Sequence, residues 1–134
     1  MIFEHFALNV ADVRAHAAWL VDNLGLKMAR KRDDSPFTHF LSDDTGRVII
    51  ELYSNLKATV PDYAATHPSL FHIAFVAKDP HAERARLEAF GATFVLVDIL
   101  PDGSSLVMMR DPCGVPIQLC QRVTSLNDYK TPST

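Results

Sequence analysis

Glu4-His5-Phe6-Ala7-Leu8-Asn9-Val10 is the stretch that decides the fold, because a similar stretch occurs 67 positions later as Phe71-His72-Ile73-Ala74-Phe75-Val76. Polar or small side chains alternate with large apolar side chains in the first stretch, which is the period of a β-strand. Each stretch is followed by an aspartate, an alanine-rich segment and then a glycine, at Gly25 and at Gly91. The chain therefore contains two copies of one structural unit.

The alanine-rich segments have the spacing of helices that pack on a sheet. In the first copy, Val13, Ala17, Leu20 and Leu24 recur at helical intervals after Asp12, which predicts a helix that ends at Gly25. In the second copy, Asp79-Pro80 is a helix start, with a capping residue before a proline at the first helical position. We expect the second helix to pack through a narrow alanine stripe, and the histidines of both helices to face solvent. The residues concerned are Ala82, Ala85, Ala89, His16 and His81.

Three further strands follow each predicted helix. Turn-forming residues separate these strands, which cover residues 26–32, 37–41 and 48–53 in the first copy and 93–100, 105–109 and 115–121 in the second. The sequence thus predicts an α+β fold of two tandem βαβββ modules, which together form a half-open barrel. We assign residues 1–122 to a single domain, with modules 1–54 and 69–122, a linker 55–68 and a C-terminal tail 123–134.

The composition narrows the range of partners. The chain has 134 residues, of which 48% are hydrophobic and 22% charged, and a net charge of -3, so it has no basic surface for nucleic acid or an anionic membrane. No apolar run approaches the roughly 20 residues that cross a bilayer, and the N-terminus lacks the pattern of a signal peptide. Cys113 and Cys120 form neither a CxxC pair nor a disulfide framework. We expect a cytoplasmic protein with a small-molecule partner.

One residue of metal-ligand type stands at the same place on the first and the last strand of each module. These residues are His5 and Glu51, then His72 and Gln118, and each pair is 46 residues apart. Imidazole nitrogen, carboxylate oxygen and amide oxygen are ligands for divalent ions such as Zn²⁺, Ni²⁺, Fe²⁺, Co²⁺ or Mn²⁺. A single histidine on a strand is usually a hydrogen-bonded core or surface residue, but two at equivalent positions favour a site. The pattern predicts one bound divalent ion.

The paired modules, the two opening stretches and the closing stretch Asp111-Pro112-Cys113-Gly114-Val115-Pro116-Ile117-Gln118-Leu119 resemble the vicinal oxygen chelate superfamily over residues 1–122. This superfamily includes glyoxalase I, fosfomycin-resistance enzymes, extradiol dioxygenases, methylmalonyl-CoA epimerase and bleomycin-resistance proteins. The resemblance implies a metal held from the first and last strands of the modules, at His5, Glu51, His72 and Gln118. It also implies a homodimer, and leaves open whether the cleft lies within one chain or is shared by two.

The sequence departs from the glyoxalase I pattern of His, Glu, His, Glu at the last position. Gln118 stands where glyoxalase I has the carboxylate that serves as ligand and base, and an amide does not accept a proton at neutral pH. Glu51, at the equivalent position of the other module, is then the candidate base. We predict a metal-dependent lyase or isomerase that chelates two adjacent oxygens of a small substrate while Glu51 moves a proton.

Two other functions remain open on the same residues. His5, His72 and Glu51 have the composition of a facial triad on Fe(II), as in an extradiol-type dioxygenase. A metal-free binding protein of the bleomycin-resistance kind would instead hold its ligand by shape and aromatic contacts.

Four residues outside the ligand set are left with open roles. Arg110 is a candidate for binding a substrate anion, and His39 points either into the cleft or away from it. The tail is either mobile or folds over a site or a partner chain through Leu126 and Tyr129.

Overall fold

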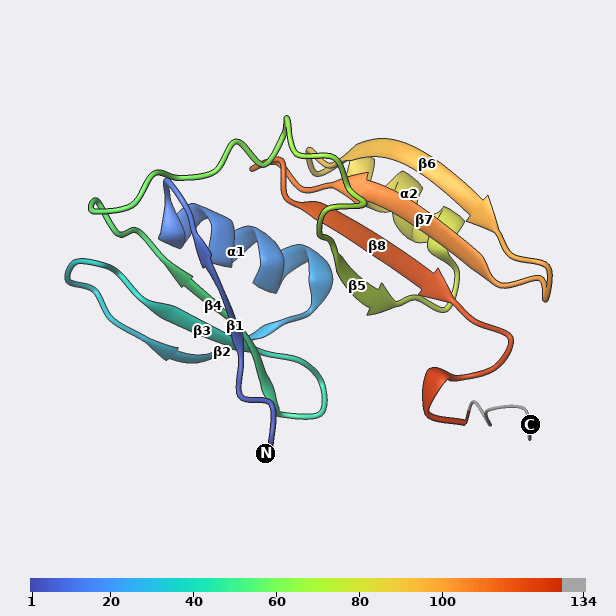
Figure 1. Ribbon diagram of the computed structural model, residues 1–134, viewed down its shortest axis with the longest axis horizontal. Coiled ribbons are helices and arrows are strands. Elements are labelled where there is room, and N and C mark those ends of the chain that lie inside the picture. Colours follow the sequence, from blue (N-terminus) through green and yellow to red (C-terminus); the bar gives the residue numbers. More distant parts are fainter. Residues whose placement is uncertain (129–134) are drawn as a thin grey trace. The chain divides into compact units, whose positions relative to one another are not determined.

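The computed structural model describes residues 1–128 and shows two open four-stranded sheets, each with one α-helix on one face (Figure 1). The strand orders are β1-β4-β3-β2 and β5-β8-β7-β6, so each sheet has the same topology. The elements are β1 (Phe6–Asn9), α1 (Val13–Leu24), β2 (Lys27–Lys31), β3 (His39–Ser42), β4 (Val48–Tyr53), β5 (Ile73–Val76), α2 (Pro80–Glu88), β6 (Thr93–Ile99), β7 (Ser105–Arg110), β8 (Pro116–Gln121) and a 3-10 helix (Leu126–Asp128). The prediction of an α+β fold with two tandem βαβββ modules is confirmed.

Helix α1 covers one face of the first sheet. Asp12 caps its N-terminus, where the carboxylate accepts a hydrogen bond of 3.0 Å from the backbone N–H of Ala15. Gly25 ends it in the left-handed conformation with φ of 71°. Val13, Ala17 and Leu20 are buried as predicted, while Leu24 of the same predicted stripe is only half-buried. The helix packs against β3 and β4. His16 was expected in solvent but is only 1% exposed, because it lies one turn from both Val13 and Leu20 on the same side of the helix.

Helix α2 packs on the second sheet through other residues than predicted. Asp79 caps it and Pro80 occupies its first turn, which confirms the predicted start. Its buried residues are Pro80 and Leu87, whereas the predicted stripe of Ala82, Ala85 and Ala89 is exposed. The prediction of that stripe was wrong, because a leucine buries more apolar surface than the alanines around it. Between the two buried residues, the guanidinium of Arg84 lies 3.4 Å from the centre of the Phe94 ring.

The predicted linker is divided between two compact units, Met1–Pro61 and Asp62–Thr134. In the first unit, the Asn9 side chain accepts a hydrogen bond of 2.8 Å from the N–H of Asn55 and donates one of 3.1 Å to the carbonyl of Ala58. In the second, the Arg110 guanidinium donates to the carbonyls of Tyr63 and Thr66, at 2.8 Å each. Each half of residues 55–68 is therefore bonded to its own unit.

The C-terminal tail is described only in part. Residues 126–128 form the 3-10 helix, while Tyr129, one of its two predicted anchors, lies outside the described residues. Within residues 1–128, no helix is long and apolar enough to cross a membrane.

Candidate functional site

The four predicted ligand residues occupy equivalent positions in the two sheets. Ala7 on β1 pairs with Glu51 on β4, and Ala74 on β5 pairs with Gln118 on β8. His5 lies two residues before Ala7, and His72 lies two residues before Ala74. The same parallel register thus places one histidine beside one oxygen-bearing side chain in each unit.

In the first unit, the predicted ligand atoms are in contact. Nε2 of His5 lies 3.0 Å from Oε2 of Glu51, and the two side chains keep 25% and 20% of their exposure. The His5 ring also packs edge-to-face with the Phe40 ring, with ring centres 5.5 Å apart and planes at 81°. Phe40 pairs with Glu51 across β3 and β4, so it fixes the imidazole on the side where the carboxylate lies.

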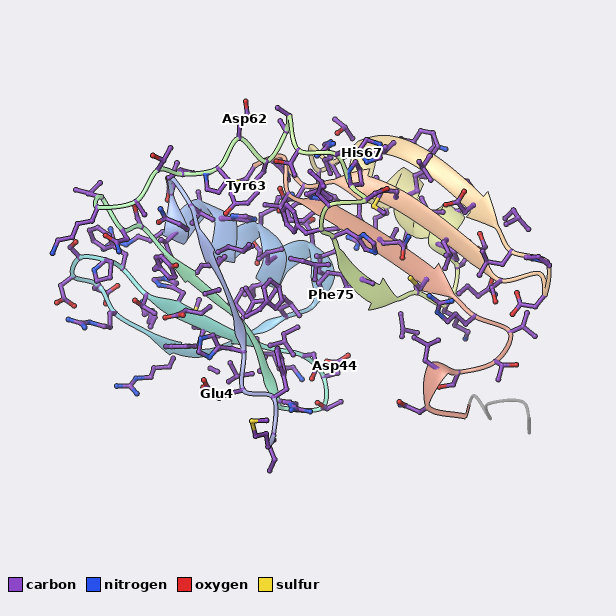
Figure 2. The ribbon with its side chains drawn as sticks, viewed as in Figure 1. Glu4, Asp44, Asp62, Tyr63, His67 and Phe75 are labelled. Atoms are coloured by element: carbon purple, nitrogen blue, oxygen red, sulfur yellow. The ribbon has the colours of Figure 1, made fainter. Side chains whose placement is uncertain are left out.

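Glu4 lies on the other side of the same imidazole. Its Oε2 is 2.5 Å from Nδ1 of His5, and its exposed side chain lies two residues before β1 (Figure 2). Histidines that bind metals commonly present their second ring nitrogen to a carboxylate or a carbonyl, which fixes the ring and makes the ligand nitrogen more basic. In His5 the Glu4 carboxylate is close to this nitrogen but makes no hydrogen bond with it, so the contact is electrostatic, while Nε2 is directed to Glu51.

In the second unit, a backbone carbonyl has the position that Glu4 has in the first. Nδ1 of His72 lies 3.0 Å from the carbonyl oxygen of Pro68, in the loop that follows Tyr63 and His67 (Figure 2). A carbonyl only accepts hydrogen bonds, so Nδ1 carries the proton of this bond. The lone pair of the neutral ring is then on Nε2, which is the nitrogen available to a metal.

Gln118 is held by a neighbour on its own strand. Its side chain is 8% exposed, and Oε1 accepts a hydrogen bond of 3.3 Å from the thiol of Cys120. Burial raises the pKa of the Cys120 thiol, so the thiol stays protonated and acts as the donor at neutral pH. An amide oxygen has two lone pairs, so this bond leaves one for a further partner.

The pair in the first unit fits two ligands of one divalent ion. With metal to ligand bonds of about 2.1 Å and angles of about 90° to 109°, two ligand atoms lie about 3.0 to 3.4 Å apart. The His5 to Glu51 distance of 3.0 Å is within this range. In the second unit, the oriented Nε2 of His72 and the amide oxygen of Gln118 are donors of the same class, so each unit by itself presents donor atoms of the kind that the predicted metal requires.

A family model described as the Glyoxalase/Bleomycin resistance protein/Dioxygenase superfamily matches residues 2–119. The chain belongs to this superfamily. No match was found among curated proteins.

Solved structures with the fold of this superfamily member cover most of its length. SMU.1112c is 25% identical with a TM-score of 0.68, over 90% of this chain and 98% of the other. Lactoylglutathione lyase from Agrobacterium tumefaciens is 22% identical with a TM-score of 0.63, over 89% and 92%. TnmS3, an antibiotic binding protein from Streptomyces sp. CB03234, is 20% identical with a TM-score of 0.69, over 90% and 95%.

Two residues with open roles are assigned by the structure. His39 pairs with Leu52 on the face of the first sheet that α1 covers, so it points away from Glu51, and its Nδ1 lies 2.7 Å from the carbonyl of Phe37. Arg110 donates hydrogen bonds to three backbone carbonyls, including that of Gly114 at 3.1 Å. Arg110 therefore holds the chain around residues 62–66 in place.

Two supporting groups were missed by the sequence analysis. Glu4 could have been found, since it is a carboxylate directly before a candidate ligand. The carbonyl of Pro68 carries no sequence signal, because every residue has one.

Proposed function

We propose that this member of the superfamily is a metal-dependent enzyme of the lyase or isomerase class. In this proposal His5, Glu51, His72 and Gln118 hold one divalent ion, drawn from Zn²⁺, Ni²⁺, Fe²⁺, Co²⁺ or Mn²⁺. The observation that supports it is the contact of 3.0 Å between His5 and Glu51, together with the identical register of the second pair. When bound, such an ion supplies Lewis acidity to two adjacent oxygens of a small substrate.

Within this set, the chain's own groups have distinct tasks. Glu51 takes a proton from the carbon beside the substrate oxygens and returns it to the product. Gln118 does not share this task, because its amide does not accept a proton at neutral pH. The Pro68 carbonyl keeps the imidazole of His72 in one orientation through its hydrogen bond, and the Glu4 carboxylate places a negative charge beside Nδ1 of His5. Phe40 excludes water from one side of His5.

The test combines metal content with proton exchange. Protein purified without a metal-affinity tag is analysed for metals beside the His5→Ala/His72→Ala double variant, and we expect about one equivalent in the parent and none in the variant. Methylglyoxal with glutathione, and small hydroxyketones, are then incubated in deuterated water. We expect the parent to introduce deuterium beside the oxygens, and Glu51→Gln to lose this exchange. Parent protein without metal and without exchange would contradict the proposal.

A metal-free binding protein is the second candidate function. It is favoured by Gln118, which replaces the base of the glyoxalase I pattern with a group that neither carries charge nor moves protons. This function predicts unchanged thermal stability after addition of Zn²⁺, Ni²⁺, Mn²⁺ or Fe²⁺, whereas the enzyme is stabilised by its ion. Oxygen uptake with catechols under Fe(II) would instead indicate the dioxygenase. The proposed homodimer is tested separately by light scattering.

A further inference from the structure

The second unit contains a pocket that the four ligand residues do not explain. It has a volume of about 380 Å³ and lies between β5, the end of β8 and residues 122–127. Figure 2 labels Phe75 on the strand that forms one wall. Ala74, Val76, Cys120 and Leu126 give the lining its apolar character. The size is in the range of small-molecule sites, which are mostly apolar with a few polar groups that fix orientation.

This pocket is on the same sheet face as His72 and Gln118. Side chains of a strand alternate between faces, so Gln118, Cys120 and Arg122 point to one side of β8 and its extension. The hydrogen bond from Cys120 to Gln118 confirms that the first two share a face. At about 3.3 Å per residue, Arg122 is about 13 Å along the strand from Gln118. A ligand in the pocket would therefore extend along β8 from the proposed metal ligands His72 and Gln118 toward Arg122.

Arg122 is the charged residue among those that line the pocket. Within residues 1–127, no hydrogen bond or ion pair joins its guanidinium to another group. Its field reaches Asp102, whose pKa is lowered mainly by hydrogen bonds from Ser104 and to a smaller extent by Arg122. The planar guanidinium presents paired N–H donors that match the two oxygens of a carboxylate.

We propose that the pocket binds an organic anion through Arg122, with the apolar segment of that ligand over Ala74, Val76, Cys120 and Leu126. As a substrate, this molecule carries a carboxylate or similar oxyanion at one end and two adjacent oxygens at the other. The placement of the two adjacent oxygens near His72 and Gln118 rests on the proposed function. The recognition of the anion depends only on residues of the second unit.

The test measures binding to metal-free protein in the presence of a chelator. The probes are 4-phenylbutyrate and its uncharged analogue 4-phenylbutanamide, titrated by calorimetry into the parent and into Arg122→Gln, Arg122→Lys and Arg30→Gln. Arg30 is an exposed arginine of β2 and is the matched control. We expect Arg122→Gln to weaken binding of the acid at least about tenfold, in line with one lost charge-assisted interaction. Arg122→Lys retains part of the affinity, and Arg30→Gln retains all of it.

Three results would overturn the assignment: no saturable binding of the acid, equal affinity for the amide, or an Arg122→Gln variant within about twofold of the parent. Thermal melting of each variant shows that it is folded. The His5→Ala/His72→Ala variant separates the two proposals, because we expect it to bind the acid as the parent does. If binding is lost there and retained in Arg122→Gln, the acid is held by the ligand residues and the inference is wrong. If the acid binds but no metal or exchange is found, only the proposed function fails.

Discussion

The Nε2 atom of His5 lies 3.0 Å from the Oε2 atom of Glu51, although 46 residues separate them in the sequence. Parallel pairing of β1 with β4 places Glu51 opposite Ala7, and the chain before β1 brings His5 back over the carboxylate. Phe40 and Glu4 contact the same imidazole from two other directions. A nitrogen and an oxygen that are positioned before a ligand arrives lose little conformational freedom on binding it, which favours affinity.

Removal of either member of this pair should abolish tight metal binding. We expect His5→Ala and Glu51→Gln to lower the affinity for Zn²⁺ or Ni²⁺ by more than about 100-fold, since loss of a supporting partner alone commonly lowers it 10- to 100-fold. Glu4→Gln, which removes only a supporting charge, should lower the metal affinity by the smaller factor of about 10 to 100. Competition with a chromophoric chelator measures all three constants. His81→Ala is the control, because His81 is an exposed residue of α2, and a similar loss there would show that the effect is not specific to the pair.

Substitution of Gln118 by glutamate should make stability depend on metal and on pH. The side chain is 8% exposed, and burial favours the neutral form of the introduced carboxyl. The loss of stability relative to the parent is then small near pH 4 and grows as the pH rises, to about 1 to 3 kcal/mol at pH 7 without metal. Urea denaturation at both pH values, with and without Zn²⁺, measures this difference in the free energy of unfolding between variant and parent. Addition of Zn²⁺ should remove the difference at pH 7.

Gln121→Glu provides the matched comparison for that variant. Gln121 is an exposed residue at the end of β8, so its replacement should change stability by no more than about 0.5 kcal/mol at either pH. A Gln118→Glu variant that is as stable as the parent at pH 7 without metal would show that the position is solvated.

The repeat explains why much of the fold and of the candidate pairs could be predicted. Each copy has a strand signal with a histidine at the same place and an oxygen-bearing side chain 46 residues later. If both copies fold alike, this spacing determines how the first and last strands of each module pair. The observed strand pairing is the same in both modules. The packing face of α2 could not be read in this way. Its alanines have helical spacing, but Leu87 is the larger apolar side chain, and burial follows size rather than repetition.

Hydrogen bonds between the backbone and side chains that are distant in the sequence could not be predicted either. Arg110 was a candidate for a substrate anion, yet its donors are taken by backbone carbonyls of residues 63, 66 and 114. Arg122 gave no sequence signal, and becomes a candidate only when the strand direction and the chain after β8 are known. Charge alone does not distinguish these two arginines, because the difference lies in which backbone groups are within reach.

The two cysteines should react with iodoacetamide at very different rates. Cys113 is exposed, whereas Cys120 is buried and its burial raises the pKa of its thiol. The thiolate is the reactive form, so a raised pKa means a smaller reactive fraction at pH 8. We expect Cys113 to be modified more than about tenfold faster, and the rate at Cys120 to keep rising at higher pH. Mass spectrometry of peptides measures both rates, and Cys113→Ser should leave only the slow one. Equal rates would mean that β8 opens readily.

Gly114→Ala should destabilise the second unit and weaken metal binding, unlike Gly46→Ala. Both glycines have positive φ, of 87° and 80°, so each substitution carries about 1 to 2 kcal/mol of backbone strain. A Cβ at Gly114 would also lie 2.6 Å from the backbone nitrogen of Ala64, whereas a Cβ at Gly46 meets nothing within 4 Å. We therefore expect urea denaturation to show a loss in the free energy of unfolding of roughly 3 kcal/mol or more for Gly114→Ala, and of about 1 kcal/mol for Gly46→Ala. Equal losses of stability would show that the Ala64 backbone moves aside without cost.

The same substitution should also affect metal binding. A shift of the Ala64 backbone would move the segment that leads to Pro68, whose carbonyl orients His72. Metal affinity should therefore fall in Gly114→Ala and not in Gly46→Ala.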